Sequence, residues 1–257
     1  MTTTRTLLAA GRVAALAAVV LGAATTLTAN AKPKAPLPLK EAKLNIEHNA
    51  TDHDTGFQGA IDGDGWKRLD VTGPDGDVVL TFRGRGELAD LGLTELFFET
   101  VEPENADVPI AEMLDKLPAG NYTIEGPAQE NGENLGRTEG VALLTHVIPA
   151  GPVLLAPAEG ATVPATGLVV RWSPVTKDLD GNDLTVIAYQ LIVEKNVPVH
   201  PHMIGKQSSL SMYLPPSVTS VVVPDALLEA GTPYNWEVLA IEESGNQTLS
   251  SGTFTTE

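Results

Sequence analysis

The segment Leu228-Glu229-Ala230-Gly231-Thr232-Pro233-Tyr234-Asn235-Trp236-Glu237-Val238-Leu239-Ala240 decides the fold of the second half of the chain. Its Gly231 and Pro233 predict a turn, because both residues punctuate regular structure. After the turn, apolar side chains recur at every second position from Tyr234 to Ala240, which is the pattern of a strand with one buried face. The segment therefore predicts a turn that leads directly into a core strand.

Further short strands are expected around this segment, separated by Gly and Pro turn signals. In the second half they are residues 160–163, 168–174, 187–194, 220–224 and 252–256. If alternate residues of each strand face one core, the large side chains available to fill it are Trp172, Tyr189, Tyr234 and Trp236. The pattern predicts an all-β sandwich.

From Val153 to Thr256 the order and spacing of these segments resemble a fibronectin type III domain. Residues 168–174, with Trp172, resemble its second strand, and residues 187–194 match the Tyr-x-Leu-x-Val pattern of its third. Residues 228–240 resemble its tyrosine corner, in which a Tyr near the start of the sixth strand bonds back to the preceding turn. The resemblance implies an immunoglobulin-like sandwich that acts as a spacer, adhesion or ligand-presenting module. Residues 195–213 depart from the family, so the place of the fourth strand stays open.

The first half, residues 43–150, predicts another β-rich, sandwich-like domain, and the Pro and Gly residues at 149–152 predict the boundary with the domain at 151–257. It resembles the sandwich domains that precede such modules in exported bacterial proteins. The expected strands are residues 44–48, 66–71, 77–82, 93–101, 122–125 and 141–148, with a hairpin turn at 73–76. One short helix is expected at 108–117, capped by Asp107 and with Pro109 in its first turn.

The N-terminus has the three-part pattern of a secretory signal peptide, residues 1–31. Arg5 and Arg12 supply positive charge, residues 13–27 are apolar, and Ala29-Asn30-Ala31 fits a cleavage site. The alternative is a membrane anchor, but that needs about 20 predominantly apolar residues. Residues 32–42 predict a Pro-rich linker. No later segment is apolar enough to span a bilayer, so no integral membrane segment is expected after cleavage.

Composition narrows the class of protein. The formal net charge is −17, and it becomes −19 once a signal peptide with two Arg and no acid is removed. Such a surface repels nucleic acids and anionic lipids, so no nucleic-acid partner is expected. It favours solubility and weak calcium binding. The chain has no Cys, which excludes disulfides and thiolate chemistry and favours a bacterial secreted or periplasmic protein.

Two acidic segments are candidates for calcium sites. Residues 178–183 place carboxylates at alternate positions but lack the Gly and Glu of an EF-hand loop. Asp62-Gly63-Asp64-Gly65 is explained by tight turns without a metal. A His/Asp set at His48, Asp52, His53 and Asp54, and the pair His200 and His202, lack a full transition-metal spacing. No catalytic, cofactor-binding or metal residue is therefore assigned, and no cofactor is expected.

No nucleophile-elbow, phosphate-loop or dinucleotide motif is present in the sequence. The sequence thus predicts an exported, non-enzymatic binding or scaffold protein whose partner is an unidentified protein or polysaccharide. A secreted carbohydrate-active enzyme or its accessory module is the first alternative, because the pairing of carboxylates in space is invisible in sequence. A calcium-stabilised adhesin is the second.

Overall fold

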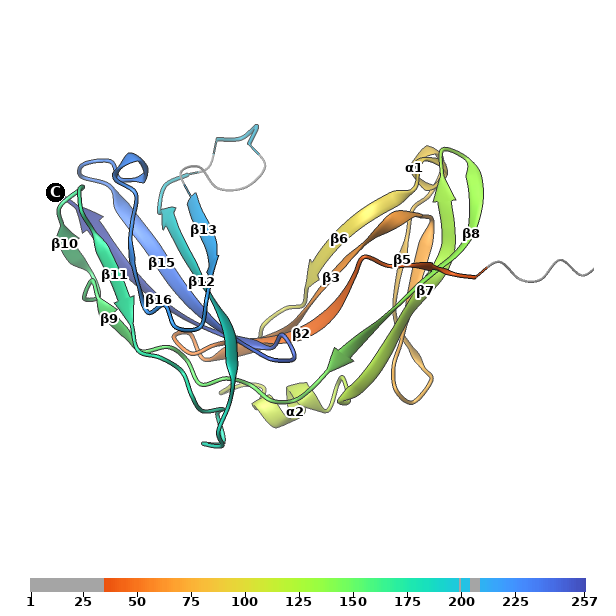
Figure 1. Ribbon diagram of the computed structural model, residues 1–257, viewed down its shortest axis with the longest axis horizontal. Coiled ribbons are helices and arrows are strands. Elements are labelled where there is room, and N and C mark those ends of the chain that lie inside the picture. The colour runs from red at the N-terminus through yellow and green to blue at the C-terminus, as the bar shows by residue number, and fades with distance from the viewer. Residues whose placement is uncertain (1–34, 199, 204–208) are drawn as a thin grey trace, which may run out of the picture. The chain divides into compact units, whose positions relative to one another are not determined.

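The computed structural model describes residues 35–198, 200–203 and 209–257 (Figure 1). The predicted signal peptide, residues 1–31, lies outside the described residues. The described chain consists mainly of β-strands, so the predicted all-β class is confirmed. In these ranges no helix is long and apolar enough to cross a bilayer.

The first sandwich consists of two facing sheets. One contains β2 (Glu41–Asn49), β3 (Asp54–Trp66) and β6 (Leu93–Glu99). The other contains β5 (Val78–Arg83), β4 (Arg68–Thr72), β7 (Gly120–Glu130) and β8 (Glu133–Leu144), in that order. The short strand β1 (Leu37–Pro38) pairs in parallel with β8, so the range expected to be a linker already contributes to the sheet.

The second sandwich repeats this arrangement. One sheet contains β9 (Leu154–Ala156), β11 (Val169–Trp172) and β14 (Ser220–Val222). The other contains β13 (Ser209–Leu214), β12 (Val186–Lys195), β15 (Pro233–Glu242) and β16 (Gln247–Thr256). The additional strand β10 (Ala161–Val163) pairs in parallel with β16, as β1 does with β8. The unassigned fourth strand of the family pattern is therefore β13.

The structure corrects the tight turns predicted at residues 62–65. The acidic Asp62–Gly65 segment is not a tight turn, because it continues β3, which pairs with β2 at Asp62 and with β7 at Trp66. The glycines there permit close approach between strands. A Cβ on Gly65 would lie 2.1 Å from the Gln129 carbonyl oxygen, so the segment serves the crossing of β3 between the two sheets.

The helical content also differs from expectation. The predicted helix is shortened to α2 (Ile110–Leu114), and its N-cap is Pro109, not Asp107, with no side-chain cap. Met113 is its buried residue and packs into the first core. A second helix, α1 (Glu87–Leu91), was not predicted, because its five residues are too few to show a helical period.

Each sandwich has its own buried core, in which apolar side chains from both sheets meet. The first contains Leu44, Ile46, Phe57, Ile61, Trp66, Leu69, Val71, Met113, Tyr122, Ile124, Ala142, Leu144 and Ile148. The second includes the four aromatics predicted for it, Trp172, Tyr189, Tyr234 and Trp236, each at most 1% exposed. The division into two domains at residue 150 is consistent with these separate cores, and we propose it on that basis.

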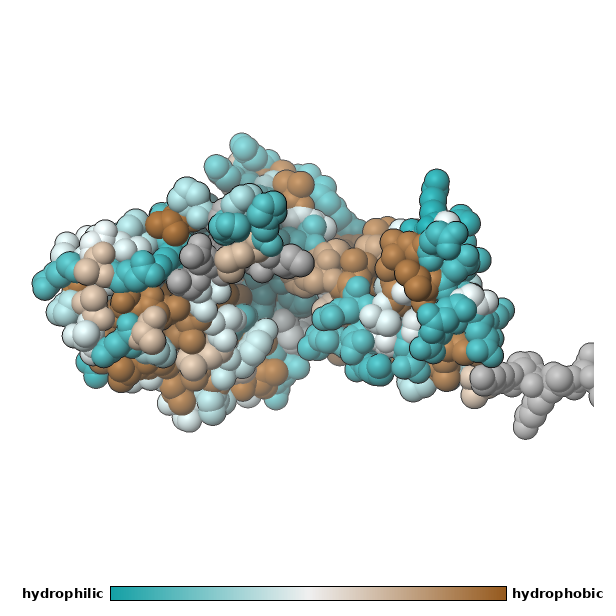
Figure 2. All heavy atoms as spheres, turned by 90° about the horizontal axis from the view of Figure 1, so that it is seen from above, coloured by the Kyte–Doolittle hydropathy of each residue, from teal (hydrophilic) through white to brown (hydrophobic). Residues whose placement is uncertain are grey.

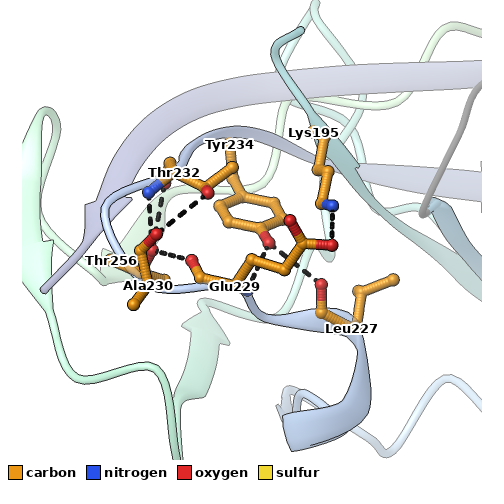
Figure 3. Close-up of polar contacts among 7 residues, drawn as sticks. All are labelled: Lys195, Leu227, Glu229, Ala230, Thr232, Tyr234 and Thr256. Carbon is orange, nitrogen blue, oxygen red and sulfur yellow. Dashed lines mark hydrogen bonds and ion pairs between the residues drawn. The ribbon is translucent and has the colours of Figure 1, made fainter. Parts of the chain in front are cut away.

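The predicted tyrosine corner lies where the 3₁₀ turn η1 (Asp225–Leu227) leads into β15 (Figure 3). The Tyr234 hydroxyl donates to the Leu227 carbonyl (2.9 Å) and accepts from the Glu229 N–H (2.8 Å). The buried Lys195 forms an ion pair with Glu229 of the same turn. The first sandwich has a matching bond, from the Tyr122 hydroxyl to the Pro118 carbonyl (2.8 Å).

The two sandwiches are joined edge to edge. Strand β2 pairs in parallel with β16, from Gln247 opposite Glu47 to Leu249 opposite Asn49. Strands β6, β3, β2, β16, β15, β12 and β13 thereby form one continuous sheet, called here the joined sheet. The Ala50 N–H extends the pairing by donating to the Leu249 carbonyl (2.9 Å).

At the other end of this pairing, next to Gln247, lies Asn246, whose side-chain amide is fully buried. Its Oδ1 accepts from the Ile46 N–H (2.8 Å), and its Nδ2 donates to the carbonyls of Val147 (2.8 Å) and Thr145 (3.0 Å). The side chain therefore acts as an additional peptide group between the two sandwiches. The pairing of β2 with β16, together with Asn246, is called here the joint.

We expect Asn246→Ala to lower the free energy of unfolding by about 3 kcal/mol, because it leaves a buried N–H and two carbonyls without partners. The matched control is Asn182→Ala, which removes one side-chain hydrogen bond, from the Asn182 amide to Asp178, in an exposed turn and should cost less than about 1 kcal/mol. Urea unfolding followed by circular dichroism measures both. Equal losses in the two variants would show that the joint contributes no more than a surface turn.

Candidate functional site

The outward face of the joined sheet is hollowed into a groove of about 890 Å³. All seven strands of the joined sheet contribute lining residues, because successive side chains on a strand point to opposite faces. The polar lining residues on the strands are Glu41, Lys43, Asn45, Glu47, Gln58, Gln190, Glu237 and Gln247. The apolar ones are Ala60, Phe97, Ile187, Ala188, Ile192, Leu239, Leu249 and Ile241, with Tyr213 beside them. The groove exists only because the joint makes the two sheets continuous.

Two exposed aromatic side chains line the groove from the outermost strands of the joined sheet. Phe97 lies on β6 and is 61% exposed, and Tyr213 lies on β13 and is 70% exposed. They are the most exposed aromatic residues of the described chain. The sequence signal for them is alternation, since Phe97 lies between the half-buried Leu96 and Phe98, and Tyr213 between the half-buried Met212 and Leu214.

The groove is acidic. Its lining carries Glu41, Glu47, Glu237 and Glu243, whereas its one cation, Lys43, is paired with Glu41 (2.5 Å). The surface seen in Figure 2 is mostly polar, with separate apolar patches. Charge at the groove thus has the same sign as the whole chain, and favours a partner with positive charge.

A cluster of three carboxylates lies beside the joint, at Glu47 on β2, Glu99 at the end of β6, and Glu102 after it. One oxygen from each lies within 4.8 Å of the others. Glu47 is 7% exposed and accepts a hydrogen bond from Gln247, and Glu99 accepts one from Gln58 (2.9 Å). Oxygen ligands at this spacing suit a hard cation such as Ca²⁺.

Glu102 is the least compensated member of the cluster. Its Oε1 is buried and has no hydrogen bond within the described residues. Burial, reinforced by the charges of Glu47, Glu99 and Asp54, raises the pKa of Glu102 to about 7. Burial also raises the pKa of Glu47. The cluster can therefore hold a proton near neutral pH, or exchange it for a cation.

The structure uses the predicted His/Asp set for other contacts. His48 is buried, and its Nδ1 contacts the Thr55 hydroxyl (2.9 Å) and the Asp54 carbonyl (3.0 Å). Burial lowers the pKa of His48. Asp52 accepts a hydrogen bond from Asn49 (2.9 Å). The rings of His200 and His202 lie 5.6 Å apart, in an exposed turn.

The predicted calcium segments also form local contacts. The Asp178 carboxylate accepts from the backbone and side chain of Asn182 (2.8 and 3.0 Å), and the Asn182 side-chain bond lowers the pKa of Asp178. Asp183 pairs with Lys177 (2.7 Å), and Asp64 with Lys40 (3.3 Å). Within the described ranges, a group of three ligands occurs only at Glu47, Glu99 and Glu102, which are too far apart in sequence to form a motif.

Comparisons with known proteins concern the fold. No protein-family model and no curated protein matches the chain. Among solved structures, a two-domain fibronectin type III segment of chicken tenascin is 13% identical, with a TM-score of 0.27 over 85% of this chain and 99% of that one. The FN1–FN3 domains of chicken CNTN1 are 12% identical, with a TM-score of 0.30 over 87% and 66%. A tetra-tandem repeat from the extending region of a large adhesion protein is 15% identical, with a TM-score of 0.29 over 84% and 49%. The strand order of the second sandwich and its tyrosine corner at Tyr234 are fibronectin type III-like, and no ligand or residue role is transferred from these structures.

We expect the contribution of Glu102 to the free energy of unfolding to fall as pH rises from about 4.5 to 7. Across this window the folded state retains a proton that the unfolded state has lost, and above it the effect is constant. Glu102→Gln should therefore unfold with a free energy roughly 1–2 kcal/mol above wild type at pH 8, allowing for partial exposure.

At pH 4 the difference should vanish, because Glu102 is then protonated in both states. Glu95→Gln, at an exposed position on the preceding strand β6, is the matched control and should leave the pH profile unchanged. Urea unfolding at both pH values measures the effect. A Glu102→Gln variant less stable than wild type at pH 8 would rule out a strained carboxylate.

Proposed function

We propose that the protein is an exported, non-enzymatic binding or scaffold protein whose groove on the joined sheet holds a protein partner. The observation that carries this proposal is the groove itself, with exposed aromatics on both outermost strands and mixed polar and aliphatic side chains between them. Aromatic anchors at a partly apolar surface with a polar rim are typical of protein–protein interfaces.

A protein partner fits the groove better than a polysaccharide does. Its lining includes the aliphatic side chains of Ile187, which is 48% exposed, and of the half-buried Ile192 and Ile241, and these can pack against apolar side chains of a partner. Sugar rings stack instead on flat aromatic faces, and here the two aromatics lie on the opposite outermost strands of the joined sheet. The acidic lining favours a partner segment that presents Lys or Arg next to apolar residues. A polysaccharide partner is then one outcome of the test.

Export rests on the signal-peptide pattern of residues 1–31 and on the absence of Cys. A periplasmic or extracellular location, and a bacterial source, are proposed on the same grounds. The non-enzymatic assignment is supported by the absence of a recognised catalytic motif in the sequence.

Each alternative would use specific carboxylates. Calcium stabilisation would act through Glu47, Glu99 and Glu102 rather than through the loops singled out in the sequence. A melting temperature unchanged by Ca²⁺ and by chelator would exclude it.

Carbohydrate-active chemistry would use the same carboxylates, because a raised pKa suits a general acid. A glycan-hydrolysis screen of wild type and Glu102→Gln tests it.

We expect the double variant Phe97→Ala/Tyr213→Ala to lose at least about tenfold in affinity for the protein partner, because truncating interface aromatics costs more than about 1 kcal/mol each. The matched control is Val222→Ala, which truncates an exposed side chain on the three-stranded sheet of the second sandwich. Proteins retained from the medium and envelope of the source culture are identified first, and the retained partner is then titrated by calorimetry.

The affinity should also fall as salt rises from low to physiological concentration, because the contact is partly electrostatic. Retention of the partner by all three proteins with equal affinity would contradict the assignment of the groove. Binding on a glycan array that depends on Phe97 and Tyr213, with no protein retained, would replace the protein partner with a polysaccharide.

A further inference from the structure

The first sandwich contains a second, smaller hollow that the proposed function does not use. It is a cavity of about 470 Å³ between the two sheets, and its lining is almost entirely apolar. The lining residues are Leu44, Phe57, Val71, Val79, Leu80, Phe98, Thr100, Val101, Pro103, Met113, Lys116 and Leu117. Small-molecule sites in proteins occupy roughly 300–1,000 Å³.

The cavity lies at the open margin of the sandwich. Strand β5 pairs only with β4, and β6 only with β3, so each is an outermost strand of its sheet in the described chain. Val79 of β5 and Phe98 of β6 both line the cavity, and α2 contributes Met113. At the mouth of the cavity, the exposed Val79 and the 86% exposed Val101 bring apolar lining residues to the surface.

Such a cavity is poorly suited to water. A buried water needs two to four polar partners, whereas the polar side chains of this lining are Thr100 and Lys116. The Thr100 hydroxyl already accepts a hydrogen bond from the Phe57 N–H (3.0 Å). An apolar ligand that fills the cavity gains the hydrophobic free energy of the surface that it covers.

Lys116, the one cationic residue of the lining, indicates that a ligand with an apolar tail would have an anionic group at its other end. Lys116 follows α2, and its ammonium has a long ion pair with Glu112 (3.6 Å) while both side chains remain more than half exposed. An exposed pair of this kind contributes little. An anionic group can therefore bind Lys116 without breaking a strong interaction, and a chain attached to that group can enter the cavity.

We propose that the first sandwich binds an amphiphile with an apolar tail and an anionic head group, such as a medium-chain carboxylate, with the tail in this cavity and the head group at Lys116. This site is separate from the groove on the joined sheet. It would let the protein carry or sense a lipid-like molecule while a partner occupies the groove.

The test is calorimetric titration of the purified full chain with decanoate, decanol and decylamine, each below its critical micelle concentration. Wild type should bind decanoate at one site, decanol more weakly and decylamine least. Val79→Trp fills the cavity mouth and should weaken decanoate binding at least tenfold. Val78→Trp is the matched control, since its neighbouring exposed side chain does not line the cavity, and it should change the affinity less than twofold.

Lys116→Met tests the head-group contact separately from the tail contact. It should weaken decanoate binding several-fold and leave decanol binding unchanged. Circular dichroism checks that each variant retains the wild-type spectrum and cooperative unfolding. The proposal is overturned if wild type binds none of the three compounds, or if decanoate binds equally to the Val79→Trp and Val78→Trp variants. Equal affinities of wild type for decanoate and decylamine would overturn the role of Lys116.

Discussion

The structure depends on the joint, where Asn246 completes a parallel pairing between β2 and β16. An isolated three-residue parallel pairing is a weak link, because few hydrogen bonds oppose the entropy of ordering it. The amide of Asn246 extends it by binding Ile46, Thr145 and Val147, and it is fully buried. Opening the joint would leave these groups without partners until water reached them, which makes it more costly than its length suggests.

The joint also creates the surface that contains the proposed binding groove. An outermost strand with unpaired backbone groups invites uncontrolled pairing with other chains. Here β2 and β16, which would each end a sheet in a separate sandwich, cover one another. Their outward faces become the centre of a wider surface, and the most exposed aromatics lie on its outermost strands. The pairing of β2 with β3 and of β3 with β6 brings Glu47 close to Glu99 and Glu102, and Gln247 of β16 adds a hydrogen bond to Glu47 across the joint. Burial raises the pKa of Glu47 and of Glu102.

Local patterns predicted most of the individual strands but missed β3, whose glycines at 63 and 65 resemble turn residues, and they predicted the assembly poorly. The alternation from Tyr234 to Ala240 identified β15 and its tyrosine corner, because burial of one strand face follows directly from a period of two. The expected strand 122–125 contains the matching Tyr122 but predicts no second tyrosine corner there. The preceding Leu117-Pro118-Ala119-Gly120 is nevertheless similar to Leu228-Glu229-Ala230-Gly231, which precedes Tyr234. The groove, the cavity and the acidic cluster depend on residues far apart in the chain, which no local pattern relates. No local pattern marks Asn246 as a buried residue, since its partners lie about a hundred and two hundred positions away.

Amide hydrogen exchange of Ile46 and Ala50, followed by NMR, tests the joint most directly. Both N–H groups donate across it, to the Asn246 side chain and to the Leu249 carbonyl. We expect both amides to exchange as slowly as the amide of Val238 in the second core, because their hydrogen bonds break only when the structure unfolds. Exchange within minutes, while Val238 stays protected, would show that the two sandwiches separate freely and that the groove is not a lasting surface.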